Sequence, residues 1–177
     1  MQIFQTISTN INNTKFLGLI IDSSFSWKDH IIELTSKLNK ACYAIRAIKP
    51  FMSLDAMKMI YYSYVQSVMS YSIIFCSNSH LSGNIFKAQK GIIRIITNAG
   101  KRDSCRQLYK QLQILPLPSL RISSLLVFVN KSRSLFLSNS EIHDRNTRYN
   151  YNLYLPSTNS TLVQSCILEV RLITTYH

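Results

Sequence analysis

One regular run of apolar residues constrains the fold of this chain more than any other feature. Between residues 27 and 48, seven apolar side chains recur at alternating spacings of four and three: Trp27, Ile31, Leu34, Leu38, Ala41, Ile45 and Ile48. This spacing places all seven on one stripe of an α-helix, and such a stripe must be buried. We expect Ser26 and Asp29 to cap the start of this helix and Pro50 to end it. The sequence therefore predicts a long amphipathic helix packed on a core.

Further helices are predicted after this one. A second begins near Ser53, and its apolar surface consists of Met57, Ile60, Tyr61, Tyr64, Val65, Val68 and Met69. After a loop at residues 77–83, a third helix carries Ile85, Ile92, Ile93 and Ile96 until Gly100 breaks it. Pattern and length together favour the centre of a helical bundle over a membrane span, because Lys58 and Gln66 interrupt the apolar segment 57–76.

Two shorter patterns complete the predicted bundle. A fourth helix follows Asp103 or Ser104 and carries Leu108 and Leu112. The run Leu115-Pro116-Leu117-Pro118 predicts an extended link, because a residue before proline avoids the helical region. A fifth helix is then expected from Ser119 to about Leu137.

The two ends of the chain have different patterns. Gln2–Ile7 and Lys15–Ile21 are β-prone runs, and the asparagines between them (Asn10, Asn12 and Asn13) predict a turn and therefore a hairpin. Beyond Ser138 the chain is rich in Asn, Ser, Thr and Tyr and shows no sustained period. The predicted fold class is mainly α: a short N-terminal β-hairpin over residues 1–25, a bundle of about five helices over 26–137, and a loosely ordered tail over 138–177.

The charge of the chain is strongly positive and unevenly placed. Twenty Lys and Arg against eight Asp and Glu give a net charge of +12, which favours a polyanionic partner. Ten of the basic residues lie between Lys87 and Arg133, and Asp103 alone opposes them. Ordinary solvated helix faces are the alternative explanation. The residues expected to contact a nucleic-acid backbone are Lys87, Lys90, Arg94, Lys101 and Arg102.

Residues for catalysis are scattered. The eight carboxylates lie singly along the chain, and only Asp29 and Glu33 share a helical face, where they favour the helix dipole rather than a metal site. The four His residues and four Cys residues lack the spacing of a zinc site. The sequence therefore predicts no catalytic residue and no metal ligand. Widely separated cysteines, together with an N-terminus unlike a secretory signal, predict a reduced, intracellular location in the cytoplasm or nucleus.

Several short segments carry a family resemblance when they are taken in order. The run Lys15-Phe16-Leu17-Gly18 is followed by further matching segments, which are Ser26-Trp27, His30-Ile31, Lys37-Leu38, Ala41-x-Tyr43, Tyr61 to Tyr71, Gln89-Lys90, Ile93-Arg94-Ile95-Ile96, Cys105, Leu108-Tyr109, Leu115-Pro116 and Asn146-Thr147-Arg148. Their order and spacing resemble reverse transcriptases of jockey-like non-LTR retrotransposons. The resemblance covers about residues 1 to 160.

The resemblance implies the edge of a polymerase palm followed by its thumb. It implies primer-grip contacts at Lys15, Phe16, Leu17 and Gly18; an ordinary hairpin with Gly18 as a close-packing strand residue is the alternative. The family's catalytic Y/F-A-D-D motif does not occur in this sequence. We therefore expect the chain to begin after the active site and to be inactive alone, with Mg²⁺ implied only for the parent polymerase. Residues 167–177 depart from the family pattern.

The expected function is that of a reverse-transcriptase fragment that grips a template–primer duplex without reading its sequence. The expected partners are RNA or DNA duplex and the missing fingers and palm, with no membrane. Other hypotheses are a decayed transposon-derived protein without selected activity, a small basic helical nucleic-acid-binding protein, and an enzyme completed by a second chain. Attachment of the basic cluster to anionic lipid is a further alternative.

Overall fold

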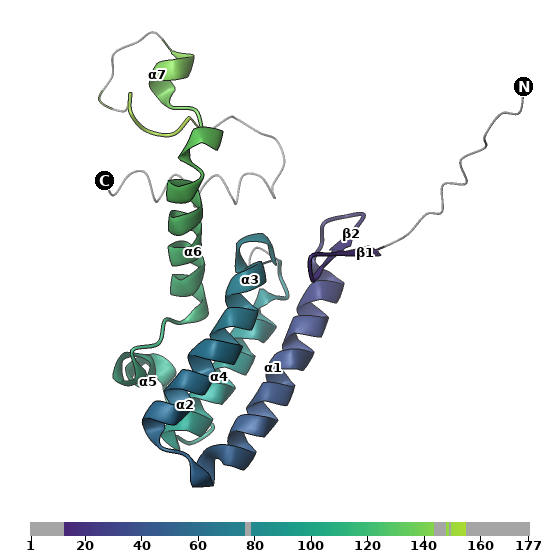
Figure 1. Ribbon diagram of the computed structural model, residues 1–177, viewed down its shortest axis with the longest axis vertical. Coiled ribbons are helices and arrows are strands. Elements are labelled where there is room, and N and C mark those ends of the chain that lie inside the picture. Colours follow the sequence, from purple (N-terminus) through teal and green to yellow (C-terminus); the bar gives the residue numbers. More distant parts are fainter. Residues whose placement is uncertain (1–12, 77–78, 144–147, 149, 155–177) are drawn as a thin grey trace, which may run out of the picture.

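The computed structural model describes residues 13–76, 79–143, 148 and 150–154 (Figure 1). A two-stranded hairpin precedes a series of helices, so the prediction of a mainly α fold with an N-terminal hairpin is confirmed. The elements are β1 (Asn13–Phe16), β2 (Leu19–Asp22), α1 (Lys28–Ile48), η1 (Lys49–Phe51), α2 (Leu54–Ile60), η2 (Tyr61–Gln66), α3 (Ser67–Cys76), α4 (Ser82–Thr97), α5 (Cys105–Leu112), α6 (Leu117–Lys131), η3 (Arg133–Leu135) and α7 (Asn139–Ile142).

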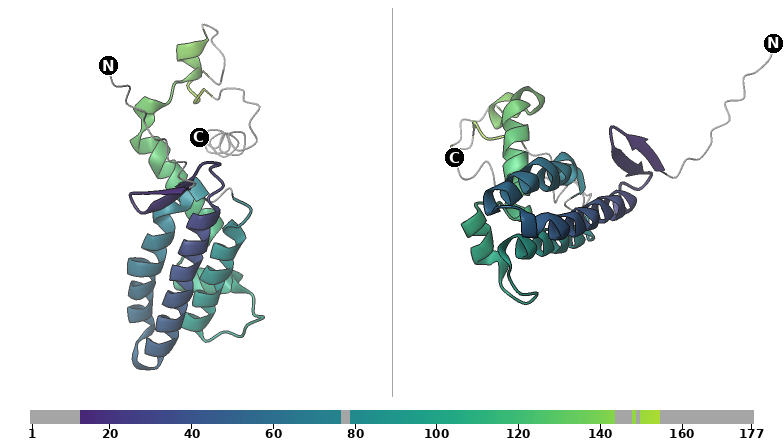
Figure 2. Two further views of the ribbon diagram at one scale, coloured as in Figure 1. Left: turned by 90° about the vertical axis from the view of Figure 1, so that its right-hand side faces the viewer. Right: turned by 60° about the horizontal axis from the view of Figure 1, so that its bottom comes forward.

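The core lies between α1, α4 and the continuous helix formed by α2, η2 and α3, which pack side by side (Figures 1 and 2). The predicted stripe of α1 is confirmed. Its buried members are Ile31, Leu34, Leu38, Ala41 and Ile45, whereas Trp27 and Ile48 at the two ends are half-buried. Each fully buried aliphatic side chain of this kind contributes about 1.5–3 kcal/mol of transfer free energy, so the stripe is a main source of stability.

The second predicted helix contains a π-helical turn, η2. The helix begins next to Ser53 as predicted, and the structure shows Ser53 as its cap, because the Ser53 hydroxyl accepts a hydrogen bond from the Ala56 amide at 3.3 Å. The buried residues recur every four positions: Met57, Tyr61, Val65, Met69 and Ile73. A strict four-residue repeat would rotate around an ideal α-helix by about 40° per step, and the wider π-helical turn offsets part of that rotation. Tyr64, predicted on the apolar surface, is instead exposed.

The hairpin turn differs from the prediction. The chain reverses at Leu17 and Gly18, so that Phe16 pairs with Leu19 and Lys15 with Ile20. Both turn residues have positive φ, 46° and 80°, which is the backbone of a tight two-residue hairpin turn and favours glycine at its second position. The predictions of one strand over residues 15–21, and of Gly18 inside a strand, were therefore wrong. Residues 2–7 and the asparagines at 10 and 12 lie outside the described residues.

The start of α1 also differs from the prediction. The helix begins at Lys28 after Trp27, whose backbone is left-handed and whose side chain caps nothing. Asp22 organises the loop instead, because its carboxylate accepts hydrogen bonds from the Ser26 hydroxyl at 2.6 Å and the Ser26 amide at 2.8 Å. These bonds, the Ser26 hydroxyl first, lower the pKa of Asp22. The Ser26 hydroxyl accepts a hydrogen bond from the Lys28 amide at 3.4 Å, so this part of the predicted cap is present. Asp29 instead accepts from the Asn13 side chain at 2.8 Å, so the predicted role of Asp29 in the cap was wrong.

Two further helix ends differ from the prediction. Helix α4 ends at Thr97, and Asn98 adopts the left-handed cap conformation (φ 62°) before Gly100 is reached. Helix α6 begins at Leu117 rather than Ser119, with Pro118 in its first turn. Proline is tolerated there because the first amides of a helix have no partner within the helix. Helix α6 stops at Lys131, and η3 covers part of the remaining span to residue 137.

Part of the predicted irregular tail is ordered. Helix α6 extends past the end of α3 and carries η3 and α7 at its far end (Figure 1). Ser138 and Glu141 form a capping box at α7, and Ser138 pairs with Leu153 in an isolated antiparallel bridge. Leu153 is buried, so residues 138–143 and 150–154 pack locally. Residues 155–177 lie outside the described residues.

Within the described residues, no single helix has the length and apolar composition needed to cross a membrane. Helices α5 and α6 pass that test only as a pair, and they are bent by 47° where they meet.

Candidate nucleic-acid interface

One face of α4 carries three of the five predicted backbone contacts. Lys87, Lys90 and Arg94 are separated by three and four residues, which places them side by side on a helix. The opposite face of α4 is buried through Ile85, Ile92, Ile93 and Ile96. Lys87 is exposed, and Lys90 and Arg94 are half-buried at the edge of this face, because the apolar side of the helix is committed to the core.

An open groove of about 600 Å³ lies between α4 and α5. Its cationic lining residues are Lys90 from α4 and Arg106 and Lys110 from α5, and none of the described residues that line it is a carboxylate. Its other lining residues are Phe86, Ser104, Cys105, Tyr109, Ile114, Leu115 and Pro116. The groove thus combines a mostly apolar floor with three positive charges.

Among the described residues, no carboxylate forms an ion pair with a groove cation. The ion pairs that the structure shows between described residues join Glu33 to Lys15 and Lys37, far from α5 in sequence. The Lys90 ammonium lies 4.0 Å from the centre of the Phe86 ring, which stabilises it by a cation–π contact and leaves its charge in place. Arg106 and Lys110 are exposed. The groove therefore has a positive potential that suits an anion.

Arg94 has a structural contact that the sequence did not indicate. Its Nε and Nη2 atoms donate hydrogen bonds to the Asp103 carbonyl oxygen at 3.2 and 2.9 Å. The Asp103 carboxylate accepts a hydrogen bond from the Gly100 amide at 2.7 Å. These bonds hold the loop between α4 and α5, in which Lys101 and Arg102 are exposed. Arg94 thus positions the loop that presents two other predicted contacts.

A buried glutamine joins the walls of the groove. Gln89 is fully buried on α4. Its Nε2 atom donates to the Tyr61 hydroxyl at 2.8 Å and to the Leu115 carbonyl at 2.9 Å. Its Oε1 atom accepts from the Tyr109 hydroxyl at 3.0 Å and from the Leu117 amide at 2.9 Å. All four hydrogen-bonding positions of this amide are therefore used, and they tie α4 to α5 and to the start of α6.

Burial has a clear effect on the two tyrosines of this network. It raises the pKa of Tyr61 to about 12, against the opposing effect of the Gln89 hydrogen bond. Burial also raises the pKa of Tyr109, and the neighbouring Tyr61 adds to that shift. Both hydroxyls therefore stay protonated at neutral pH, and that of Tyr109 can act as a hydrogen-bond donor.

Sequence reasoning did not select Gln89, Arg106 or Lys110 for this site. Gln89 occupies a position in the apolar stripe of α4, four residues after Ile85 and three before Ile92. A polar residue in such a stripe is a signal for a buried hydrogen-bonding network. The i, i+4 spacing of Arg106 and Lys110 on a short helix was a second usable signal.

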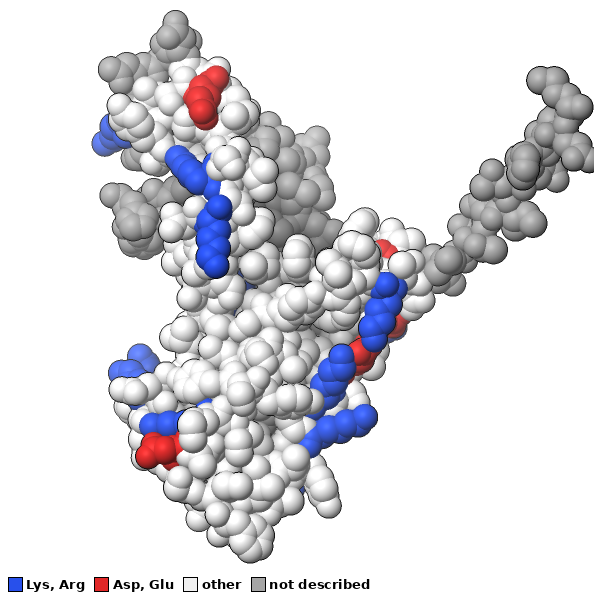
Figure 3. Space-filling view, viewed as in Figure 1, with Lys and Arg blue, Asp and Glu red and all other residues white. Residues whose placement is uncertain are grey.

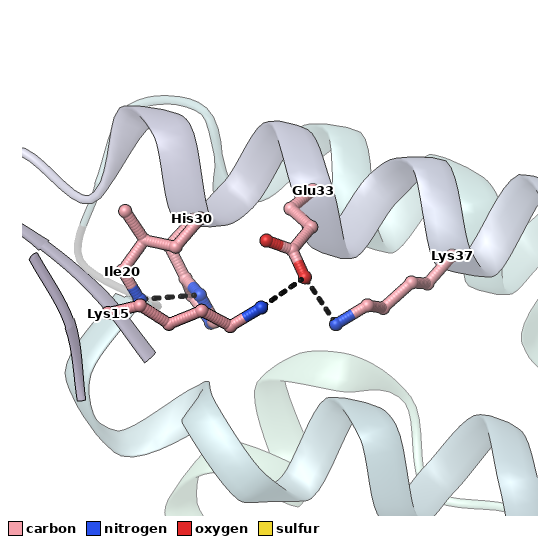
Figure 4. A network of polar contacts seen from close by, with 5 residues as sticks. All are labelled: Lys15, Ile20, His30, Glu33 and Lys37. Atoms are coloured by element: carbon pink, nitrogen blue, oxygen red, sulfur yellow. Dashed lines mark hydrogen bonds and ion pairs between the residues drawn. The ribbon is translucent and has the colours of Figure 1, made fainter. Parts of the chain in front are cut away.

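The residues predicted for a primer grip form the hairpin tip and its neighbour. The Lys15 ammonium lies 3.7 Å from the Glu33 carboxylate, and Lys37 lies 2.5 Å from the same oxygen (Figure 4). The hydrogen bond from Lys37 is the main cause of a lowered pKa of Glu33. Phe16 and Leu17 are 60% and 71% exposed. The Tyr71 hydroxyl of α3 donates a hydrogen bond to the Leu17 carbonyl and so holds the turn that contains Gly18.

His30 lies beneath this hairpin. Its Nδ1 atom accepts a hydrogen bond from the Ile20 amide at 3.4 Å, which connects β2 to the first turn of α1 (Figure 4). The side chain is buried, and burial lowers the pKa of His30 despite the opposing effect of Glu33. The imidazole is therefore neutral in the folded protein at neutral pH.

The structure keeps the two predicted contact regions apart. The hairpin lies at the N-terminal end of α1, whereas α5 lies on the opposite side of the bundle (Figures 1 and 2). On the face shown in Figure 3, Lys and Arg side chains follow one edge of the molecule in a line with Asp and Glu among them, and others lie in separate groups. The hairpin and the α4–α5 region are therefore two distinct surfaces.

The chain matches no known relative. Comparison with protein-family models, with curated proteins and with solved structures finds no match. Among the described residues, no three His, Cys, Asp or Glu side chains are placed to hold a metal ion.

Proposed function

We propose that this chain binds the backbone of nucleic acid through a surface around the α4–α5 groove. We name it the α4–α5 surface, and it consists of Lys87, Lys90, Lys101, Arg102, Arg106 and Lys110. The observation that carries the proposal is the set of three groove cations without a carboxylate among the lining residues.

A polyanion is the partner that such a surface favours most. Phosphates recur at short intervals along a nucleic acid, and each cation that neutralises one releases a condensed counterion, which drives binding. Contacts of this kind position a protein on nucleic acid but carry no sequence information. We therefore propose binding that is tight at low salt and largely independent of sequence.

The resemblance to reverse transcriptases supports a more specific role. A hairpin followed by a helical bundle is the order expected for a palm edge and thumb, and the hairpin tip at Lys15 to Gly18 would be a second contact near a primer end. In this proposal the chain grips a template–primer duplex, and the catalytic carboxylates and their Mg²⁺ belong to fingers and palm supplied elsewhere. The chain itself then has no polymerase activity.

The salt dependence of binding tests this proposal. Fluorescence anisotropy of a labelled RNA–DNA duplex should show the logarithm of affinity falling with the logarithm of salt at a slope of about −4 to −5, as expected for about five phosphate contacts. Two duplexes of unrelated sequence should bind equally. Absence of binding at low salt, or binding that does not respond to salt, would contradict the proposal.

Primer extension tests the more specific role. The purified chain with Mg²⁺, template, primer and nucleotides should give no extension. Extension by this chain alone would show that it holds a complete active site and would overturn the proposal of a gripping segment.

A further inference from the structure

We infer that the α4–α5 groove receives one unpaired nucleotide of the bound nucleic acid, with its phosphate at the rim and its base on the apolar floor. This inference rests on the proposed function and adds a ligand class to the same surface.

The lining of the groove fits a ligand that is anionic on one side and flat and apolar on the other. The rim supplies Lys90, Arg106 and Lys110, and the floor includes Phe86, Tyr109, Ile114, Leu115 and Pro116. Phosphate contacts alone would need no such floor. A paired base is stacked within a duplex and cannot enter a groove, whereas an unpaired base can pack against a protein surface. A nucleotide at the end of a duplex, or in a gap, meets both requirements.

Lys90 is placed to respond to a phosphate. Its ammonium lies 4.0 Å from the centre of the Phe86 ring, and it is the groove cation contributed by α4. A phosphate is a stronger partner for an ammonium than a ring face is, because the phosphate carries full negative charge. When a phosphate draws the ammonium away, the face of Phe86 is uncovered. Arrival of the phosphate therefore prepares a surface on which the base can stack.

The groove walls are held in place before any ligand arrives. Gln89 fixes two of the lining residues, because it accepts a hydrogen bond from the Tyr109 hydroxyl at 3.0 Å and donates one to the Leu115 carbonyl at 2.9 Å. Arg94 holds the loop that leads into α5. Because these groups are already ordered, binding does not incur the entropy cost of ordering them. A preformed groove with this charge and floor is suited to a ligand of defined shape.

Three probes of the same duplex test the inference, using the full chain and fluorescence anisotropy. The first duplex is blunt, the second has a short single-stranded overhang, and the third has the same overhang without bases. Base stacking on a protein surface predicts that the overhang raises affinity by about fivefold or more. The abasic overhang should lose most of that gain, because it keeps the phosphates and lacks the base.

A pair of matched variants locates the effect in the groove. Leu115 is 45% exposed in the groove floor, and Ile122 is 52% exposed on α6 outside it. Leu115→Ser should bring the ratio of overhang affinity to blunt-duplex affinity, both measured on that variant, close to one. Ile122→Ser should keep the ratio of the parent protein. Circular dichroism melting of both variants checks that they fold.

The outcomes separate this inference from the proposed function. Equal, salt-dependent affinity for all three probes would overturn the inference and leave backbone binding intact. Binding to none of them at low salt would overturn both. A competition experiment compares a polyglutamate peptide with an oligonucleotide of equal charge. If both displace the overhang duplex equally, the inference is overturned, because the groove then accepts any polyanion.

Discussion

The hairpin region and the α4–α5 surface both contain residues predicted to contact nucleic acid, but their cations differ in whether a carboxylate is paired with them. At the hairpin, Lys15 and Lys37 share the Glu33 carboxylate, so charge is used to attach the hairpin to α1. At the α4–α5 surface, an uncharged network around Gln89 holds the helices together, and Lys90, Arg106 and Lys110 have no carboxylate among the residues that line their groove.

This difference shows which cations are available to a partner. A lysine that is already paired must leave its carboxylate before it can bind a phosphate, and an exposed pair of this kind is worth little to stability. A cation held near a neutral, rigid wall incurs no such exchange. We therefore expect the α4–α5 surface to dominate nucleic-acid binding, and the following changes test the comparison from the largest expected effect to the smallest.

Replacing Gln89 with leucine should cause the largest loss. The change removes four hydrogen bonds and leaves the Tyr61 hydroxyl, the Tyr109 hydroxyl and the Leu117 amide buried without this partner. Because each unsatisfied buried group costs about 1–3 kcal/mol, the free energy of unfolding should fall by about 3 kcal/mol or more. Urea denaturation measures the change. Gln107→Leu, at an exposed position of α5, is the control and should shift it by less than about 0.5 kcal/mol.

Removing the groove cations should weaken binding without unfolding the protein. The triple variant Lys90→Gln, Arg106→Gln and Lys110→Gln loses three phosphate contacts, so its salt slope should become shallower by about 2.7. When salt is raised from about 50 to about 200 mM, both proteins lose affinity, and the factor lost by the variant should be about 40 times smaller than the factor lost by the parent protein. Anisotropy titrations measure both slopes.

A variant with the same charge provides the control for this comparison. Lys28, Lys40 and Arg46 are exposed on α1, and their replacement with glutamine removes three positive charges from a different helix. This variant should keep most of the original slope. Equal losses in the two triple variants would mean that net charge, rather than the α4–α5 surface, determines binding.

Mild acid should affect the hairpin region through His30. Burial lowers its pKa in the folded protein relative to the usual 6.5, so the unfolded chain takes up a proton first as pH falls. The stabilising contribution of the neutral imidazole is complete above pH 6.5 and is lost progressively below it, because protons then favour the unfolded state. The free energy of unfolding should therefore be lower at about pH 5.5 than at about pH 7.5.

A variant of His30 tests whether its imidazole causes this pH dependence of the free energy of unfolding. His30→Gln should flatten the dependence between these two pH values, whatever its effect on stability at pH 7.5. Glu33 and Asp22 do not interfere, because their lowered pKa values place their titration at more acidic pH. An unchanged pH dependence in His30→Gln would show that the imidazole is not responsible.

Replacing Gly91 with alanine should have the smallest effect and the opposite sign. Gly91 lies inside α4 between Lys87 and Arg94, and an added methyl group would meet no atom within 4 Å. Alanine in a helix interior is more stable than glycine by about 0.5–1 kcal/mol. Thermal or urea denaturation should show that gain. A loss of stability would mean that the methyl group meets an obstacle that the structure does not show.

Several features could be predicted because they depend on residues close together in the sequence. The stripe of α1 follows from its own spacing, and the second helix begins next to Ser53 as its pattern indicated. Other local features were misread. The turn at Leu17 and Gly18 was hidden, because a leucine with positive φ has no recognisable local signal, and the hydrophobic pattern on both sides is typical of a strand. Pro118 was read as extended although it stands in the first turn of α6.

The sequence by itself determined the fold class, the long helix of the core and the surplus of positive charge. Tertiary structure alone decided what those charges do. Glu33 neutralises Lys15 across 18 residues, whereas Lys90, Arg106 and Lys110 meet around one groove because Gln89 binds groups from residues 61, 109, 115 and 117. Helical periodicity reports only which side chains share a face. Whether a charge is neutralised, and whether a buried polar group is satisfied, depends on partners that folding brings from distant parts of the chain.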